Sequence, residues 1–156
     1  IGKLRRAEPS ISIRSTFITG FPGETEEAFE NLCNFISEYK LNNAGFFTYS
    51  REAGTPAYKF PDQIPAAVKK RRLKKLVGLQ QSVAAYNNSS LIGRTLKVLY
   101  EGIDYGKNLF YGRSQYNAPE VDANVYFRAK FAYVGNFYPV RITGASGYDL
   151  EGEIVI

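Results

Sequence analysis

The sequence contains no histidine, methionine or tryptophan, and only one cysteine, Cys33. A single cysteine excludes an internal disulfide framework, and the lack of histidine argues against both zinc ligation and a Ser-His-Asp triad. No apolar run approaches the roughly 18 residues of a membrane-spanning helix, and the chain does not open on a signal-peptide pattern. We therefore expect a cytoplasmic protein without a membrane partner.

The chain also lacks an initiating methionine. Because its 156 residues begin with Ile1, we expect a piece of a longer protein, large enough for one medium domain or two small ones. The formal charge of +5 is uneven: residues 1–90 carry 13 basic and 8 acidic side chains, and residues 91–156 carry 7 of each. A basic chain suggests a polyanionic partner, but the second half does not share the excess.

A β-α-β pattern organises the first half. An apolar, β-branched run over about 11–20 predicts a buried strand that ends in a turn at Gly20-Phe-Pro-Gly23. Thr25 is a suitable N-cap for an amphipathic helix over 25–40, with Cys33 on its apolar face as a small core residue. A second strand around 46–49 implies a parallel pair. Such a glycine loop either holds a polar ligand at the strand ends or is simply a βα turn.

A long helix follows a loop over 50–65. Pro65 suits its first position, and it extends to about Ser89. The segment Lys69–Lys75 has six basic residues in seven, which indicates either a solvated helix face or a contact with a polyanion such as ribosomal RNA.

Short apolar runs between Gly, Asn, Asp and Pro clusters replace helical periodicity from Leu91 onward. About five such strands predict a small closed barrel of the OB-like kind. The expected fold class is therefore α/β plus all-β, with domains at 1–90 and 91–156.

Three segments carry a resemblance to a known family: Thr16-Phe-Ile-Thr-Gly-Phe-Pro-Gly-Glu-Thr25, Phe46–Ala57 and the helix start Asp62-Gln-Ile-Pro65. They resemble the radical-SAM methylthiotransferases, and the last 65 residues resemble the C-terminal TRAM barrel of that family. The resemblance implies that residues 1–90 are the C-terminal βα units of a radical-SAM partial TIM-type barrel. The TRAM barrel would follow at 91–156.

Two branches of the family fit, one acting on an aspartate of the twelfth small-subunit ribosomal protein and one on adenosine in tRNA. The segment Gly112–Asp122 is similar to the barrel signature of the protein-modifying branch, although Ala123 replaces its usual glycine. A neutral barrel with several acidic residues also suits a basic ribosomal protein better than RNA. The resemblance implies substrate contacts from Arg113, Asn117, Glu120 and Asp122. Glu120 and Asp122 also suit simple turn chemistry around Pro119. A non-catalytic RNA- or ribosome-binding module remains a third alternative.

The family uses S-adenosylmethionine and two [4Fe–4S] clusters, whose cysteine ligands are absent here, so this piece alone should be inactive. Many radical-SAM enzymes carry a Gly-x-Ile-x-Gly-x-x-Glu strand near the adenine. Ile18 and Gly20 match it, whereas Thr16 replaces the first Gly and Glu24 lies one position late. Arg14 would pair with the cofactor carboxylate or form a strand-edge salt bridge, and the Tyr49 hydroxyl would reach the cavity. Arg14, Ile18, Gly20, Glu24 and Tyr49 are thus the expected cofactor residues.

Overall fold

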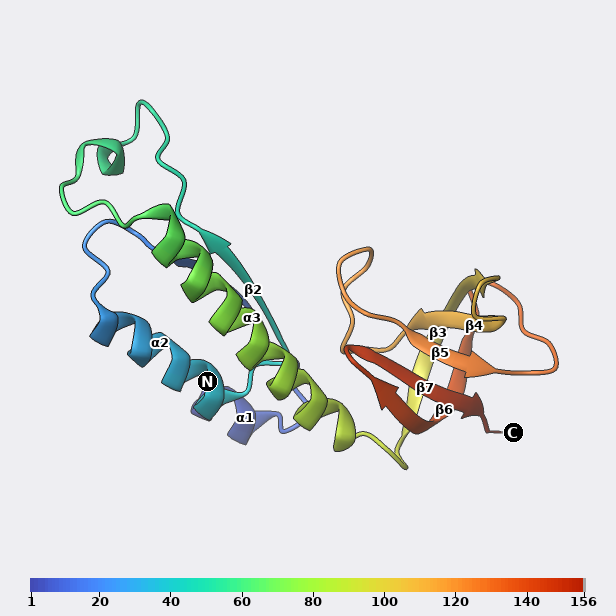
Figure 1. Ribbon diagram of the computed structural model, residues 1–156. Helices are drawn as coiled ribbons and strands as arrows, with labels where there is room; N and C mark the ends of the chain where they lie inside the picture. The colour runs from blue at the N-terminus through green and yellow to red at the C-terminus, as the bar shows by residue number, and fades with distance from the viewer. Residues whose placement is uncertain (156) are drawn as a thin grey trace. The chain divides into compact units, whose positions relative to one another are not determined.

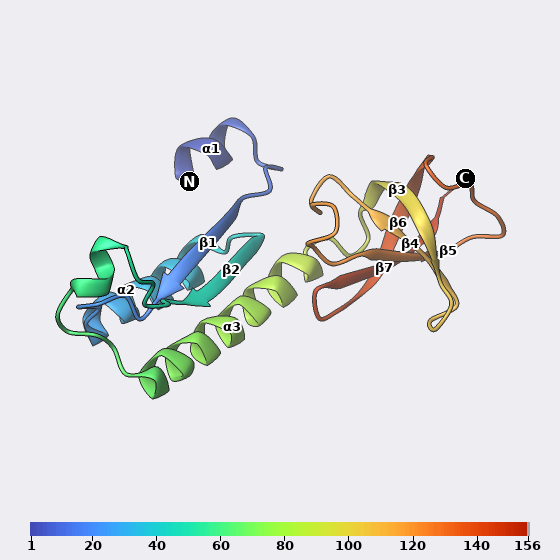
Figure 2. The same cartoon turned by 90° about the horizontal axis from the view of Figure 1, so that it is seen from above.

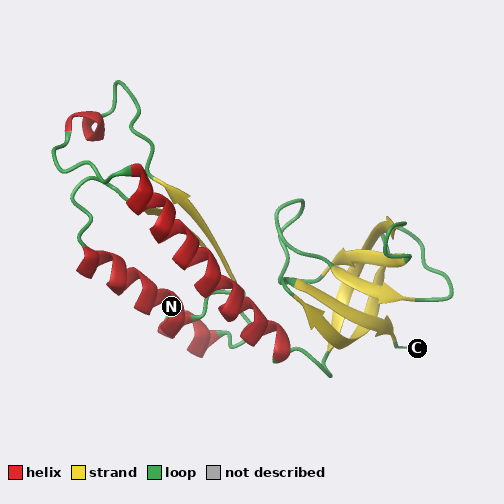
Figure 3. Ribbon diagram, in the orientation of Figure 1, coloured by secondary structure: helices red, strands yellow, loops and turns green. Residues whose placement is uncertain are grey.

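The computed structural model describes residues 1–155 and divides the chain into two compact units, Ile1–Val83 and Ala84–Ile156 (Figure 1). The first unit contains two strands and several helices, and the second begins with the end of the long helix and continues in strands and loops (Figure 3). The elements, in chain order, are α1 (Gly2–Ala7), β1 (Arg14–Thr19), α2 (Glu26–Tyr39), β2 (Asn43–Thr48), the 3-10 helix η1 (Pro56–Lys59), α3 (Ala66–Ser89), β3 (Thr95–Asp104), β4 (Leu109–Arg113), β5 (Val125–Arg128), β6 (Phe137–Ser146) and β7 (Asp149–Ile154).

The predicted β-α-β unit is present in the first unit. Strands β1 and β2 pair in parallel, with Arg14 opposite Asn43 and Thr19 opposite Thr48. The connecting helix α2 is capped as expected, because the Thr25 hydroxyl accepts a hydrogen bond from the Ala28 amide at 3.0 Å.

One face of this two-stranded sheet packs on the helices. Phe17 and Phe46 stack at 5.7 Å between ring centroids and pack against a buried cluster from α2 and α3. Cys33 belongs to that cluster, and burial raises the pKa of its thiol, so it is a core residue as predicted. The cluster consists of Phe29, Cys33, Ile36, Leu76 and Val83.

Some local boundaries differ from the predictions. Asn43 and Gly45 lie within β2 rather than in the turn, because Lys40 already turns the chain by adopting a left-handed conformation at φ 44°. Tyr49 follows the end of β2. Pro65 precedes α3 instead of occupying its first position, since its carbonyl accepts the first helical hydrogen bond from Lys69.

The second unit is a closed barrel with strand order β3-β4-β5-β7-β6, as predicted from the short apolar runs (Figure 2). Among the described strand pairs of the barrel, β5–β7 is parallel and the other four are antiparallel. Alternate side chains fill the interior, which consists of Leu96, Val98, Tyr100, Val125, Phe127, Val140, Ile142 and Leu150.

Helix α3 crosses the division between the units, which falls after Val83. Within the second unit, Asn88 Nδ2 near the end of this helix donates to the carbonyls of Gly147 and Tyr148 at 3.4 and 3.1 Å. A domain boundary near residue 91 stays a prediction.

Candidate cofactor and substrate sites

The candidate cofactor site lies at the carboxyl ends of β1 and β2 in the first unit. The loop after β1 turns at Gly20 and Gly23, whose φ angles of 77° and 81° are left-handed and favour glycine. The Gly23 amide also donates to the carbonyl of Asp62 at 3.1 Å, which joins this loop to the segment before α3.

The carboxylate of Glu24 is the centre of this loop. It accepts hydrogen bonds from the Gly20 amide at 2.6 Å and from the Thr19 hydroxyl at 3.1 Å. Arg72 Nη1, from α3, donates to the same carboxylate at 2.6 Å and to the Glu24 carbonyl at 3.1 Å. The side chains of Glu24 and Arg72 are only 12% and 4% exposed. This carboxylate is therefore satisfied by protein donors.

Arg72 also reaches the first turn of α2, where its Nη2 donates to the Glu26 carboxylate at 2.9 Å. This hydrogen bond lowers the pKa of Glu26. Burial alone would lower the pKa of Arg72, but its hydrogen bonds to Glu26 and Glu24 outweigh burial and raise it. The guanidinium thus joins α3, the glycine loop and α2.

Tyr49 stands at the matching end of β2. Its amide donates to the Thr19 carbonyl at 2.9 Å, and its carbonyl accepts from Lys69 Nζ at 2.8 Å. The ring meets Phe21 edge-on, with 5.1 Å between ring centroids. The Tyr49 hydroxyl is buried and has no hydrogen-bond partner within the described part of the chain. Arg72 Nε and Gln80 Oε1 are also buried without a partner among the described residues. A buried hydroxyl without a partner is costly, so Tyr49 stays a candidate to contact a polar group of a ligand.

The sheet face opposite the helices is largely exposed within this unit and carries an apolar pair near its carboxyl end. Ile18 and Phe47 lie opposite each other on β1 and β2 and are 58% and 62% exposed. Phe47 is exposed in this unit because the helices pack on the face of Phe17 and Phe46. Arg14 occupies the same face as Ile18, but it begins β1, about 16 Å along the strand from Thr19 at about 3.3 Å per residue.

The structure thus brings Gly20, Glu24 and Tyr49 together at one end of the sheet, places Ile18 beside them and leaves Arg14 at the other end. Two further residues of this site, Lys69 and Arg72, were missed because they fell within the basic run. Helical spacing could have identified Arg72, because Arg72 and Gln80 lie on the same buried face of α3 as Leu76 and Val83. A cation in an apolar stripe indicates a buried ion pair.

The candidate substrate residues of the barrel lie in and beside the loop between β4 and β5. Arg113 Nε donates to Glu101 at 2.6 Å across β3 and β4. The Asn117 side chain accepts from the Ser114 amide and hydroxyl and donates to the Ala123 carbonyl at 2.8 Å. These two residues shape the loop.

Asp122 has a similar role, since its carboxylate accepts from the Ala118 amide at 2.7 Å. Glu120 is exposed and left-handed at φ 59°, next to Val121, which is 70% exposed. Of the four predicted substrate residues, Glu120 is thus the one presented to solvent at the loop tip.

Other acidic residues of the barrel have basic neighbours. Asp149 lies 3.4 Å from Lys107, and Glu153 pairs with Arg141 across β6 and β7. Contact with Tyr126 and Asp149 raises the pKa of Lys107. These pairs place a basic side chain beside two of the acidic residues of the neutral barrel.

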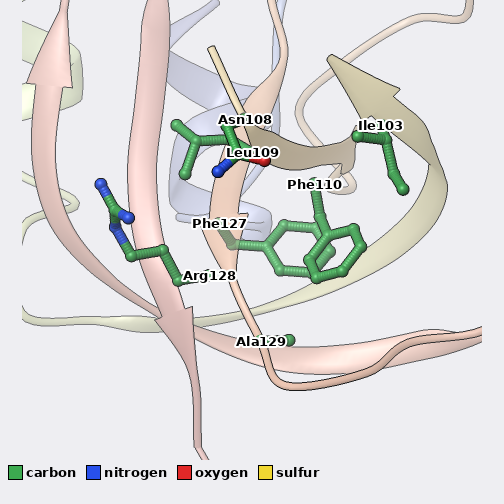
Figure 4. Close-up of a pocket in the computed structure, with 7 residues that line it drawn as sticks. All are labelled: Ile103, Asn108, Leu109, Phe110, Phe127, Arg128 and Ala129. Atoms are coloured by element: carbon green, nitrogen blue, oxygen red, sulfur yellow. The ribbon is translucent and has the colours of Figure 1, made fainter. Parts of the chain in front are cut away.

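The barrel also has a pocket of about 290 Å³ between the β3–β4 turn and the end of β5 (Figure 4). The rings of Phe110 and Phe127 face this space, 5.8 Å apart between centroids, and Arg128 extends away from them. Its floor is thus apolar and continuous with the barrel core. None of the predicted substrate residues lines it.

Residues 1–155 contain neither a metal-ligating cluster nor a membrane-spanning helix. No cluster of three or more His, Cys, Asp or Glu side chains in this range could hold a metal ion. Within the same range, no helix is both long and apolar enough to cross a membrane.

Comparison with known proteins identifies the barrel first. Residues 92–155 match the TRAM domain family. This range contains all five barrel strands, from β3 to β7, so the predicted OB-like TRAM barrel is confirmed.

Curated relatives match nearly the entire chain. The proteins named ribosomal protein uS12 methylthiotransferase RimO from Heliobacterium modesticaldum, Syntrophotalea carbinolica and Roseiflexus sp. are 44%, 47% and 48% identical to it, in each case over 99% of the chain. The chain spans about a third of the length of these relatives, 33% to 34%. These matches confirm the resemblance that the motifs indicated: nearly the entire chain is similar to a segment of proteins named RimO, and it carries a TRAM domain.

Proposed function

We propose that this chain is the C-terminal part of a radical-SAM enzyme that methylthiolates an aspartate of ribosomal protein uS12. The observation that carries the proposal is 44–48% identity, over 99% of the chain, to proteins named for that activity. The first unit would contribute closing βα units of the radical-SAM domain. The barrel would recognise the protein substrate.

The residues at the carboxyl ends of β1 and β2 fit S-adenosylmethionine. Ile18 and Phe47 offer an exposed apolar face suited to an adenine ring, and the buried Tyr49 hydroxyl lacks a partner among the described residues. Gly20 supplies the tight turn beside them. Arg14 lies on the same face but at the other end of β1, so pairing with the cofactor carboxylate would require the cofactor to extend along the strand. The bound cofactor, working with an iron–sulfur cluster held elsewhere in the parent, would supply the radical chemistry.

The barrel's charge supports a protein substrate. Its acidic and basic residues balance, and phosphate neutralisation normally requires a basic excess in RNA-binding surfaces. Glu120 offers a carboxylate at the exposed loop tip to a basic ribosomal protein.

The test uses the full-length parent, loaded with its clusters under anaerobic conditions and supplied with S-adenosylmethionine and a reductant. Purified uS12 and bulk tRNA are offered in separate reactions. We expect uS12 to gain the mass of one methylthio group on an aspartate. Modification of adenosine in tRNA, with uS12 unchanged, would reject the proposal in favour of the tRNA branch.

A contact with ribosomal RNA is a second candidate, because Lys70, Arg71, Lys74 and Lys75 of α3 are exposed. Reversing Lys70 and Lys74 to Glu should then weaken binding of the parent to ribosomal RNA and reduce the slope of log K against log salt by about 2. An unchanged slope would leave these residues as a solvated helix face.

A further inference from the structure

The basic run Lys69–Lys75 is divided between two environments. Lys70, Arg71, Lys74 and Lys75 are exposed, whereas Arg72 is 4% exposed and Lys69 is half-buried. Lys69 and Arg72 are three residues apart, so they project from the same side of α3. They are the two members of the run that contact the ends of β1 and β2.

Arg72 holds the Gly20–Glu24 loop in place through its ion pair with Glu24. The Glu24 carboxylate accepts from the Gly20 amide at 2.6 Å and from Arg72 Nη1 at 2.6 Å. Without the guanidinium, a nearly buried carboxylate would lose its compensating charge and would move toward water. The Gly20 amide would then lose the acceptor that fixes the turn.

Lys69 controls the second strand end. Its Nζ donates to the Tyr49 carbonyl at 2.8 Å, and its aliphatic stem covers Gly20 so closely that a Cβ built there would lie 2.2 Å from Lys69 Cγ. One side chain therefore contacts both the glycine turn and the residue with the unpartnered hydroxyl.

We propose that Lys69 and Arg72 are positioning residues that hold the Gly20–Glu24 loop and Tyr49 in the arrangement that binds the adenosyl cofactor. This inference rests on the proposed function for the identity of the ligand. It also assigns Glu24 a role in shaping the loop, because protein donors already occupy its carboxylate. Neither residue touches substrate in this proposal.

The experiment measures two properties of the full-length, cluster-loaded parent. Amide hydrogen exchange of peptides spanning 17–25 reports whether the loop is held. Equilibrium dialysis with S-adenosylhomocysteine, a non-reacting analogue of the cofactor, measures the affinity of the cofactor site. The variants are Arg72→Gln, Arg72→Lys and Lys69→Gln. Lys70→Gln, an exposed neighbour that loses the same charge, is the matched control.

We expect Arg72→Gln to speed exchange in 17–25 and to weaken analogue binding on the order of tenfold or more. Losses of this size follow when a residue that positions a ligand-binding group is removed. Lys69→Gln should weaken analogue binding in the same way. Arg72→Lys should recover only part of both properties, because lysine keeps the charge but cannot bridge two carboxylates. Lys70→Gln should change neither.

Each contrary result has a distinct meaning. Exchange in 17–25 that is unchanged by Arg72→Gln would overturn the positioning role, whatever the affinity. Faster exchange with unchanged affinity would overturn the link between the loop and the ligand. Suppose that the wild-type parent converts uS12, but Lys70→Gln weakens analogue binding as much as Arg72→Gln and Lys69→Gln do. The inference then fails while the proposed function stands. A wild-type parent that binds no analogue would defeat both.

Discussion

Phe46 and Phe47 are neighbours in β2 whose side chains lie on opposite faces of the sheet. Phe46 stacks on Phe17 and packs against the helix core, whereas Phe47 is 62% exposed. This alternation separates a face that stabilises the fold from a face that is available to a ligand.

That separation predicts opposite effects for two substitutions in the full-length parent. Phe46→Ala should lower the free energy of unfolding by about 2–3 kcal/mol, because it leaves a cavity against the helices. Phe47→Ala should change stability less and weaken binding of S-adenosylhomocysteine more. Denaturant titration and equilibrium dialysis measure the two effects. A larger stability loss for Phe47→Ala would mean that its face is structural.

A second prediction compares two glycines in the same loop. Gly20→Ala should lower the free energy of unfolding by about 1–3 kcal/mol, because the position combines a left-handed φ of 77° with a close approach to Lys69. Gly23→Ala has a similar φ of 81°, but nothing lies within 4 Å of its added Cβ, so about 1 kcal/mol is expected. Unfolding titrations give both values.

The contact with Lys69 can be isolated by a double-mutant cycle. Lys69→Ala should remove part of the cost of Gly20→Ala, since the side chain that occupies the space is gone, and should not alter the cost of Gly23→Ala. Additive costs at Gly20 and Lys69 would show that the backbone conformation alone disfavours a side chain there.

The order and type of the larger elements could be predicted from the sequence because they follow local rules. Thr25 caps α2, and the spacing from Phe29 to Ile36 identifies its buried face. The role of Arg72 could not be predicted, because its partner Glu24 lies 48 residues away and a run of cations resembles a solvated face.

The roles of polar residues in the loop between β4 and β5 could not be predicted from the sequence either. The sequence marks Asn117 and Asp122 as polar residues in a turn, but polar residues recognise partners in some turns and hold the backbone in others. The contacts of Asn117 with Ser114 and Ala123, and of Asp122 with Ala118, assign them to the backbone here. Only tertiary geometry separates them from the exposed Glu120.

A third prediction follows for this loop. Asn117→Ala should reduce the free energy of unfolding by about 1–2 kcal/mol, because partly buried hydrogen bonds of the loop are lost. Glu120→Lys should leave stability within about 0.5 kcal/mol, since the residue is exposed, and should weaken docking of uS12 if the barrel recognises a basic protein. Thermal unfolding and a binding titration at two salt concentrations measure these effects. Equal docking by Glu120→Lys and wild type would remove this residue from the substrate surface.

The last prediction concerns the pH dependence of the contact between α3 and α2. The hydrogen bond that Glu26 accepts from Arg72 lowers the pKa of Glu26 in the folded protein below the usual value for glutamate. The stability that this pair contributes is therefore fully present above the unfolded pKa, and it is lost as the pH falls through the folded pKa. The difference in free energy of unfolding between wild type and Glu26→Gln should be largest near neutral pH and shrink below about pH 4.5.

Glu27 provides the matched control, because it is also exposed in the first turn of α2 and no ion pair joins it to Arg72 among the described residues. Glu27→Gln should show a smaller change between neutral and acidic pH when unfolding is followed in the same buffers. The solvent exposure of Glu26 keeps its contribution modest, since water screens exposed ion pairs. A Glu26→Gln difference that stays constant from neutral to acidic pH would mean that Arg72 does not hold Glu26 in its ionised form, and that its contact with Glu24 carries the interaction between α3 and the loop.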